Sequence, residues 1–375
     1  MNAKHIITMS VALACLLASG ESLSGVVAQA RVPNTSGGAT ISCRNPVQTL
    51  GIVRTKDSTR IFQARPDGIH WQIDLPPMIA EHDQYWMAPD GAAAVVAIST
   101  HADTAEAFLV TGYYKAIEID GVVLSVDFQG DLALVATVDH RAAGALAANE
   151  DPETNAGTRI RVYSLSSGKL VGDTWFADAV PLIMKEFYVR LSGDGRHYYY
   201  VANISGREMA VVRDVVSGQK HEWGYSIAGS INDMLMYSQS RGYVVRGGKV
   251  YQFGGRELIP VQPNDDVGAV DRLVESVDSS IQAVTGNGWG VFDTSTGSWI
   301  ATGKGSSLHS SKWGLTVVDM SIDSKSVRTY DFPRMKPRLV RSISGENLDA
   351  RTLVCANAFG FMTYRSGAFI WYKSN

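Results

Sequence analysis

The chain has 375 residues, and its 34 Lys and Arg nearly balance its 37 Asp and Glu, giving a formal net charge of -3. Without a basic excess to neutralise phosphates, nucleic acid is not expected as a partner. The length allows either two domains or one large closed β architecture.

The N-terminal segment, residues 1–30, has the pattern of a secretory signal peptide. After a positive start at Lys4, the apolar run IITMSVALACLLAS has the length of a signal-peptide core. Small residues at Ala28 and Ala30 then occupy the two positions that a leader peptidase inspects. The pattern predicts removal of residues 1–30, with cleavage between Ala30 and Arg31.

Two other uses of this segment fit less well. A membrane anchor needs about 20 apolar residues, and this run is shorter and interrupted by Ser and Thr. A lipoprotein would be modified at Cys15, but Ala12 stands where a bulky aliphatic residue is needed. The sequence contains no second apolar run long enough to cross a bilayer. We therefore expect residues 31–375 to form an exported protein, periplasmic or secreted, without a transmembrane segment.

Cleavage would leave two cysteines, Cys43 and Cys355, one near each end of the mature chain. In an oxidising compartment an even pair predicts a disulfide, with two unrelated buried thiols as the alternative. The bond would close a loop of about 310 residues, and chain entropy puts its stabilisation on the order of 5 kcal/mol, less any strain. It also requires the two ends of the fold to meet, as they do in a ring.

A first repeated pattern places an Asp-Gly turn before a β-rich run. Its copies are RPDGIHWQI at 65–73, APDGAAAVVAI at 88–98 and SGDGRHYYYVANI at 192–204. Asp and Gly suit tight turns, because the Asp side chain bonds to the nearby backbone and Gly adopts positive φ. A degenerate copy, SVDSSIQAV at 276–284, lacks the Gly. Each copy therefore predicts a turn followed by a strand.

The third copy contains three consecutive tyrosines, Tyr198, Tyr199 and Tyr200. Alternate side chains of a strand face opposite ways, so Tyr198 and Tyr200 share one face and Tyr199 takes the other. The three rings therefore do not form one binding surface. We interpret them as packing on both faces of a strand whose neighbours cover both sides.

Two stretches interrupt the β pattern. HRAAGALAANEDPETNAG at 140–157 is rich in Ala, Asn and acidic residues, which predicts a projecting loop insertion. GAVDRLVESV at 268–277 places Val270, Leu273, Val274 and Val277 at helical spacing, which predicts a short helix.

A second repeated pattern ends an apolar run in a Ser-Gly or Thr-Gly turn. Its copies are RVYSLSSGKL at 161–170, VVRDVVSGQK at 211–220 and GVFDTSTGSW at 290–299. Together the two patterns give the order Asp turn, strand, short turn, strand, Ser/Thr-Gly turn, strand, which describes an antiparallel meander.

The spacing of these copies indicates a unit of about 40 to 50 residues, which is typical of a β-propeller. The sequence thus predicts an all-β fold, a single propeller over residues 31–375 built from four-stranded antiparallel sheets. If the first and last units share one blade, there are seven blades, and eight is the alternative. A pair of β-sandwiches is the other architecture, but it does not account for the period.

The motif S-x-D-G before a β run, followed by D-x-x-[ST]-G, resembles the exported bacterial relatives of the WD-repeat propellers. This group includes the propeller domains of prolyl-oligopeptidase-like proteins and the heavy subunit of methylamine dehydrogenase. The resemblance implies the propeller fold and is nearly silent on function. The chain departs from the pattern in lacking Gly-His and Trp-Asp signatures and in its irregular spacing.

Motifs that carry chemistry are weak or missing. The sequence has no G-x-S-x-G nucleophile elbow, and SSGK at 166–169 fits S-x-x-K only within an expected hairpin turn. No histidines have metal-ligand spacing, and the acidic stretches NEDPE at 149–153 and NDD at 264–266 match no calcium loop. We therefore assign no catalytic, cofactor-binding or metal residues and expect no cofactor.

Two functions remain open from the sequence. The favoured one is an exported, non-catalytic propeller that acts as an interaction or ligand-binding scaffold, with another exported protein as partner. The alternative is an enzyme or enzyme subunit with its site at the axial mouth of the propeller, such as a lyase, a hydrolase or a quinoprotein dehydrogenase heavy subunit. In the last case the cofactor would belong to a separate light chain.

Overall fold

The structure is a computed structural model, and it describes most of the chain with gaps. The described residues are 26–31, 39–45, 48–54, 59–65, 68–75, 84–88, 93–101, 104–111, 115–138, 158–176, 189–204, 207–223, 231–254, 257–274, 280–304, 307–311, 314–320, 325–344, 353–357, 360–365 and 368–373. The insertion expected at 140–157 lies outside them.

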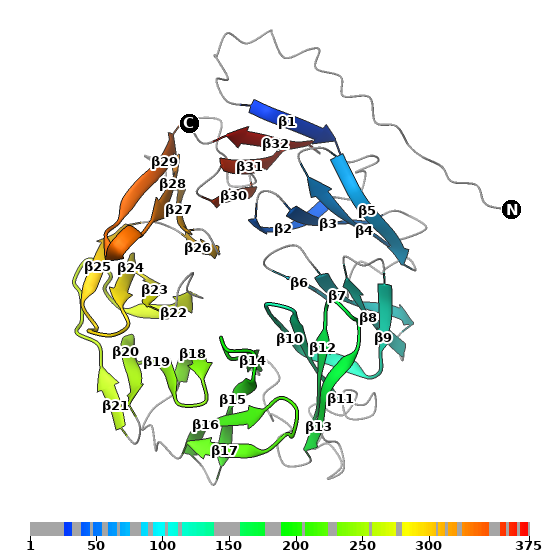
Figure 1. Cartoon of the computed structure of the whole chain (residues 1–375), viewed down its shortest axis with the longest axis horizontal. Helices are drawn as coiled ribbons and strands as arrows, with labels where there is room; N and C mark the ends of the chain where they lie inside the picture. The colour runs from blue at the N-terminus through cyan, green and yellow to red at the C-terminus, as the bar shows by residue number, and fades with distance from the viewer. Residues whose placement is uncertain are drawn as a thin grey trace, which may run out of the picture.

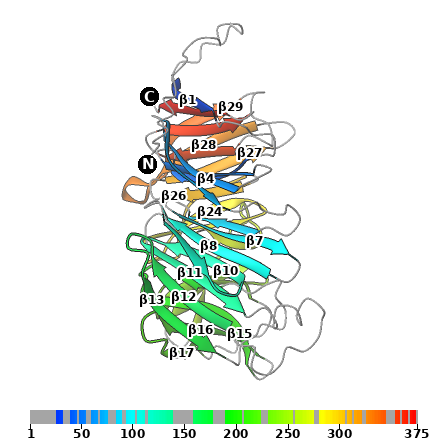
Figure 2. The same ribbon diagram turned by 90° about the vertical axis from the view of Figure 1, so that its right-hand side faces the viewer.

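The described residues form eight four-stranded antiparallel sheets, or blades, arranged as a ring (Figure 1). Each blade turns its first strand towards the middle of the ring and its last strand towards the rim. Figure 2 shows the molecule turned by 90°, with the strands of blades 2 and 3 facing the viewer. This is the β-propeller that the repeated turns predict.

The first seven blades are meanders of consecutive strands. Blade 1 contains β2 (Ala39–Asn45), β3 (Gln48–Arg54), β4 (Thr59–Arg65) and β5 (Gly68–Leu75). Blade 2 contains β6 (Gln84–Met87), β7 (Ala93–His101), β8 (Thr104–Thr111) and β9 (Lys115–Ile119). Blade 3 contains β10 (Val122–Gln129), β11 (Leu132–Val138), β12 (Thr158–Ser164) and β13 (Leu170–Phe176). Blade 4 contains β14 (Arg190–Leu191), β15 (His197–Ile204), β16 (Arg207–Asp214) and β17 (Lys220–Trp223).

The remaining blades follow the same plan until the chain returns to its start. Blade 5 contains β18 (Ile231–Ser238), β19 (Arg241–Arg246), β20 (Lys249–Gly254) and β21 (Glu257–Pro260). Blade 6 contains β22 (Val270–Val274), β23 (Ile281–Gly286), β24 (Trp289–Asp293) and β25 (Trp299–Gly303). Blade 7 contains β26 (Ser307–Ser311), β27 (Gly314–Met320), β28 (Lys325–Asp331) and β29 (Arg338–Ser344), with the 3-10 turn η2 (Pro333–Met335) before β29. Blade 8 contains β30 (Leu353–Asn357), β31 (Gly360–Arg365), β32 (Ala368–Lys373) and β1 (Val26–Arg31).

The described residues form eight sheets, which fits the alternative of eight blades better than the seven that the sequence favours. Blade 8 does combine the two ends of the chain, because β1 pairs with β32, but β1 comes almost entirely from residues predicted to be cleaved and not from the first repeat unit. However, the N-terminal region contributes only this one rim strand to blade 8. The strands β2 to β5 make a complete blade of their own, so the shared blade does not reduce the count.

The seam of the ring contains the residues predicted for processing and cross-linking. Ala30 pairs with Phe369 and Arg31 with Ala368 in the register of β1 and β32, so the predicted cleavage site lies within a strand of blade 8. Cys43 lies in β2 and Cys355 in β30, and these two inner strands of adjacent blades contact each other. Cleavage and the disulfide both remain predictions.

The three tyrosines of β15 pack between blades, as expected from strand alternation. Tyr198 and Tyr200 join a buried cluster with residues of blade 3, including Leu134 and Val162. Tyr199 joins a different cluster with residues of blade 5, including Met236. All three rings are at most 2% exposed, so the triplet fixes blade 4 between its two neighbours.

The Ser/Thr-Gly turns also form as predicted. Gly168, Gly218 and Gly297 have φ of 68°, 67° and 69°, the left-handed region that favours glycine. Each glycine N–H donates to the carbonyl four residues earlier. The shared geometry explains why one short motif recurs at the same place in blades 3, 4 and 6.

The helix predicted within 268–277 is wrong over the described residues, since Val270–Val274 is strand β22; residues 275–277 lie outside the described ranges. The register of β22 against β23 shifts between Val270 and Arg272, which marks an irregularity of the β-bulge type. An extra residue at such a site brings positions three apart to one face of a strand, and Val270 and Leu273 are both buried. The bulge therefore imitates helical spacing. Within the described ranges, no helix is long and apolar enough to cross a membrane.

Candidate functional site

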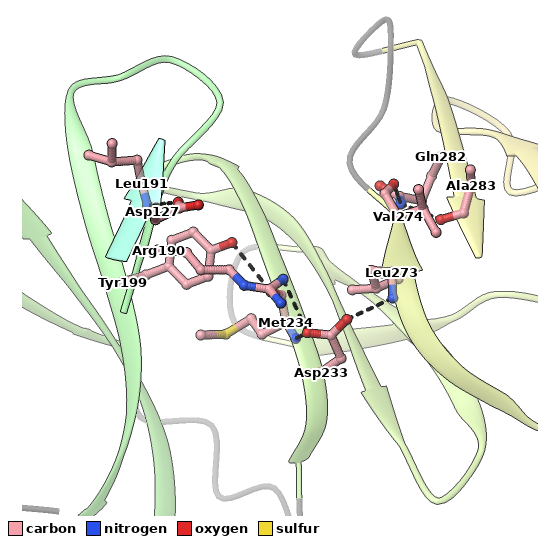
Figure 3. A network of polar contacts seen from close by, with 10 residues as sticks. All are labelled: Asp127, Arg190, Leu191, Tyr199, Asp233, Met234, Leu273, Val274, Gln282 and Ala283. Atoms are coloured by element: carbon pink, nitrogen blue, oxygen red, sulfur yellow. Dashed lines mark hydrogen bonds and ion pairs between the residues drawn. The ribbon is translucent and has the colours of Figure 1, made fainter. Parts of the chain in front are cut away.

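Charged side chains of the inner strands form a chain of polar contacts across blades 3 to 6 (Figure 3). Asp127 comes from β10, Arg190 from β14 and Asp233 from β18. These strands lie nearest the middle of the ring in Figure 1. The contacts therefore lie where an active site at the axis of the ring would be expected.

Two aspartates bind the backbone of the following blade in the same way. Asp127 Oδ2 accepts a hydrogen bond from the backbone N–H of Leu191 at 2.7 Å, which joins blades 3 and 4. Asp233 Oδ2 accepts one from the backbone N–H of Leu273 at 2.7 Å, which joins blades 5 and 6. Hydrogen bonds to an ionised acceptor are short and strong, so these carboxylates fasten neighbouring inner strands.

Arg190 supplies the link between blades 4 and 5. Its Nη1 lies 3.2 Å from Asp233 Oδ1 and donates to the backbone oxygen of Met234 at 3.2 Å. Burial acts to lower the pKa of Arg190, but its interactions with Tyr199, Asp233 and Asp127 outweigh burial, so the pKa is raised. The guanidinium thus remains charged and paired.

Tyr199 and Gln282 extend the polar chain on either side. The Tyr199 hydroxyl donates to the backbone oxygen of Met234 at 3.3 Å, and burial raises the pKa of Tyr199 well above its ordinary value. In blade 6, Gln282 accepts a hydrogen bond from the hydroxyl of Tyr237 and donates to the backbone oxygen of Val274 at 2.8 Å. Each of these polar groups already has a protein partner.

The geometry suits fastening better than catalysis. A general base or nucleophile needs a reactive atom that faces substrate, whereas these carboxylates and the guanidinium bond to one another and to backbone. Among the described residues, no group of three or more His, Cys, Asp or Glu side chains has the arrangement of a metal site. The sequence does not predict this polar chain, because its members come from strands whose proximity only the fold reveals.

The turn before β15 brings together Ser192, Asp194 and His197, the residue types of a hydrolytic triad. Their connections are different, since Ser192 Oγ donates to Asp194 Oδ1 at 2.6 Å and accepts from the backbone N–H of His197 at 3.1 Å. In a triad the serine hydroxyl donates to the imidazole, which this hydroxyl does not do. The residues therefore form the structural turn that the S-G-D-G motif predicts.

This turn also docks onto the next blade. The backbone N–H groups of Gly193 and Asp194 donate to the carbonyls of Met236 and Tyr237, each at 2.9 Å. The acidic stretch at 264–266 is likewise a turn, in which Asn264 Oδ1 accepts from the backbone N–H of Asp266 at 3.0 Å. Local backbone bonding accounts for both motifs.

Among the residues whose side chains the structure describes, the large exposed apolar ones lie on outer strands and turns and not on the inner strands. On β13, Trp175 is 57% exposed, Leu170 48% and Val171 39%. Val216, on the adjacent turn of blade 4, is 73% exposed. Solvent-exposed apolar residues that gather in one place often mark a surface for another molecule.

Comparisons with known proteins do not supply a function. No protein-family model and no curated protein matches the chain. Similar solved structures include a complex of KlAtg21 with the coiled coil of AgAtg16 (12% identity, 86% of this chain, 100% of that chain, TM-score 0.49). A second is a structure from work on two prolyl endopeptidases (11% identity, 88% of this chain, 54% of that chain, TM-score 0.47). A third is the β-propeller domain of the trilobed protease from Pyrococcus furiosus (8% identity, 83% of this chain, 99% of that chain, TM-score 0.48). This chain thus spans 54% of the endopeptidase chain.

Proposed function

We propose that this protein is an exported, non-catalytic β-propeller that serves as a scaffold for another exported protein. The observation that carries the proposal is that the charged side chains of the inner strands are bonded to neighbouring blades. Arg190, Asp233 and Asp127 bond across blade boundaries, so the groups best placed for chemistry near the axis hold the ring together. A rigid ring of this kind presents its surface loops and rim at fixed positions.

Export rests on the signal-peptide pattern of residues 1–30 and the lone pair of cysteines that follows it. Proteins that act as scaffolds present surface apolar groups to their partners, with aromatic residues most often at the centre of the contact. The exposed apolar residues on the rim, such as Val216, Ile259 and Leu339, supply such groups on three different blades.

Affinity capture from the exported fraction of the native cell, followed by binding of the purified partner, tests the proposal. Three single variants, Val216→Asp, Ile259→Asp and Leu339→Asp, place the same charge on different blades. We expect one of them to weaken binding at least tenfold while the other two serve as matched controls.

Two results would contradict the scaffold function. In one, no purified exported protein binds the wild-type chain. In the other, the chain copurifies with a small cysteine-rich subunit and the complex has dehydrogenase activity, which would favour the enzyme-subunit alternative.

A further inference from the structure

The rim strand of blade 3, β13, has an outer edge that exposes large apolar side chains. It ends the sheet order β10-β11-β12-β13, so no described strand pairs with its outer side. Within the seven residues LVGDTWF, Leu170, Val171 and Trp175 are exposed. An unpaired strand edge carries a row of free N–H and C=O groups that invites another strand, and exposed apolar side chains strengthen that tendency.

Several other rim strands carry features that block such pairing. β21 ends in Pro260, which lacks a backbone N–H. β17 has the sequence KHEW and β29 the sequence RLVRSIS, so each of these rim strands contains two charged residues. The only charged residue of β13 is Asp173, and Arg159 of the same blade binds it with an Nε–Oδ1 distance of 2.7 Å. β13 therefore has no proline, and Arg159 neutralises its one charge; its register against β12 shifts next to Val171, so the regular part of the edge begins there.

The strand is also symmetric about Asp173 in the kind of residue it carries. Two large apolar residues precede the central Gly-Asp-Thr and two follow it. If two copies of β13 pair antiparallel with Asp173 at the centre, Val171 lies opposite the partner's Trp175, and this pair occurs twice. Aromatic and β-branched residues opposite each other are favourable cross-strand pairs.

We propose that the protein forms a homodimer by antiparallel pairing of β13 with β13 of a second copy, centred on Asp173. The two blades would then form one continuous sheet of eight strands across a two-fold axis. The contact is isologous, so it closes with two copies and does not propagate into a filament. This inference concerns the chain alone and does not rest on the proposed scaffold function.

The charges at the centre are compatible with this register. Two aspartates directly opposite each other would repel, but each Asp173 has its own Arg159, whose hydrogen bond lowers the pKa of the carboxyl group. The two-fold axis therefore relates two neutralised pairs.

The other face of β13 is already held by blade 4, so the edge is presented in a fixed position. A Cβ on Gly172 would lie 2.0 Å from the backbone oxygen of Val215, which shows how closely the strand meets the blade 4 turn. A Cβ on Gly218 would lie 2.7 Å from Thr174 Oγ1. A strand fixed in this way loses little further freedom on pairing.

Sedimentation of the purified protein over a range of concentrations is the first test. We expect a monomer–dimer equilibrium in which Trp175→Lys and Val171→Glu each weaken the dimer roughly tenfold, because both symmetry-related pairs are lost. Ile259→Lys, on the rim of blade 5, is the matched control and should leave the dimer unchanged. A monomer at every soluble concentration, or equal effects of all three substitutions, would overturn the proposal.

Two further variants test the register itself. In the double variant Val171→Glu/Trp175→Lys, opposite charges face each other at both ends of the paired strands, so dimerisation should recover relative to either single variant. In Asp173→Cys, the two Cα atoms would lie about 4.5–5.5 Å apart, within reach of a disulfide. Oxidation should give a covalent dimer that Ile259→Cys and the wild type do not form. A dimer that shows neither rescue nor this cross-link would refute the β13 pairing.

Discussion

Asp233 offers the sharpest test of the fastening role of the inner strands. Its carboxylate accepts from the Leu273 N–H at 2.7 Å and from the Met234 N–H at 2.9 Å, and it lies 3.2 Å from Arg190 Nη1. A hydrogen bond to a charged group contributes about 1.5–3 kcal/mol. Because Arg190 keeps some contact with solvent, we count its pair at a reduced value. Asp233→Ala should therefore lower the free energy of unfolding by about 3 kcal/mol.

Urea unfolding, followed by tyrosine and tryptophan fluorescence and by circular dichroism, measures this loss. The matched control is Asp271→Ala, which removes an exposed carboxylate of β22 and should change stability by less than about 0.5 kcal/mol. Equal effects of the two substitutions would show that the polar chain does not fasten the blades.

A double-mutant cycle separates the ion pair from the backbone bonds. If Arg190 and Asp233 act together, Arg190→Met and Asp233→Ala should show a coupling of about 0.5–3 kcal/mol. Additive effects would mean that the aspartate acts only through the backbone N–H groups. The ion pair would then add nothing to the other contacts between blades 4 and 5.

Three further predictions concern other parts of the ring. Gly286→Ala should destabilise the protein by about 1–3 kcal/mol, because its Cβ would lie 1.8 Å from the backbone oxygen of Ala269; an unchanged thermal midpoint would contradict this close packing. Burial raises the pKa of Tyr243 to about 12, so the stability it supports is complete below its ordinary pKa near 10 and is lost as the pH rises towards 12. Tyr243→Phe should flatten that alkaline decline, and an identical pH profile would refute it. The intact mass of the exported protein should be that of a chain beginning at Arg31, less the two hydrogen atoms lost when one disulfide forms. Detection of two free thiols would exclude the Cys43–Cys355 bond.

Local chemistry explains what could be predicted from the sequence. The turns at Gly168, Gly218 and Gly297 and the alternating burial of the β15 tyrosines depend on short stretches with strong preferences. The false helix at β22 has an equally local cause, since an irregular strand register reproduces helical spacing. Period and turn chemistry therefore gave the fold class.

Contacts between residues far apart in the sequence explain which features could not be predicted. Asp127 and Leu191 are 64 residues apart, whereas Asp233 and Leu273 are 40 apart, although both pairs join consecutive inner strands. The connections between blades differ in length, so no fixed spacing marks the polar chain. The sequence leaves seven and eight blades open for the same reason, because only the strand order shows that β1 completes blade 8 without taking part in blade 1.

Closure of the ring therefore depends on two features at one seam. β1 pairs with β32 at the rim, and the cysteine-bearing strands β2 and β30 meet on the inner side. Cleavage after Ala30 would remove nearly all of β1, the rim strand of blade 8. Closure of the ring would then depend on the contact between the inner strands β2 and β30. A disulfide between Cys43 and Cys355 would then matter most in the processed protein. Reduction should accordingly destabilise a chain that begins at Arg31 more than one that begins at Val26, and equal losses would show that β1 does not contribute to closure.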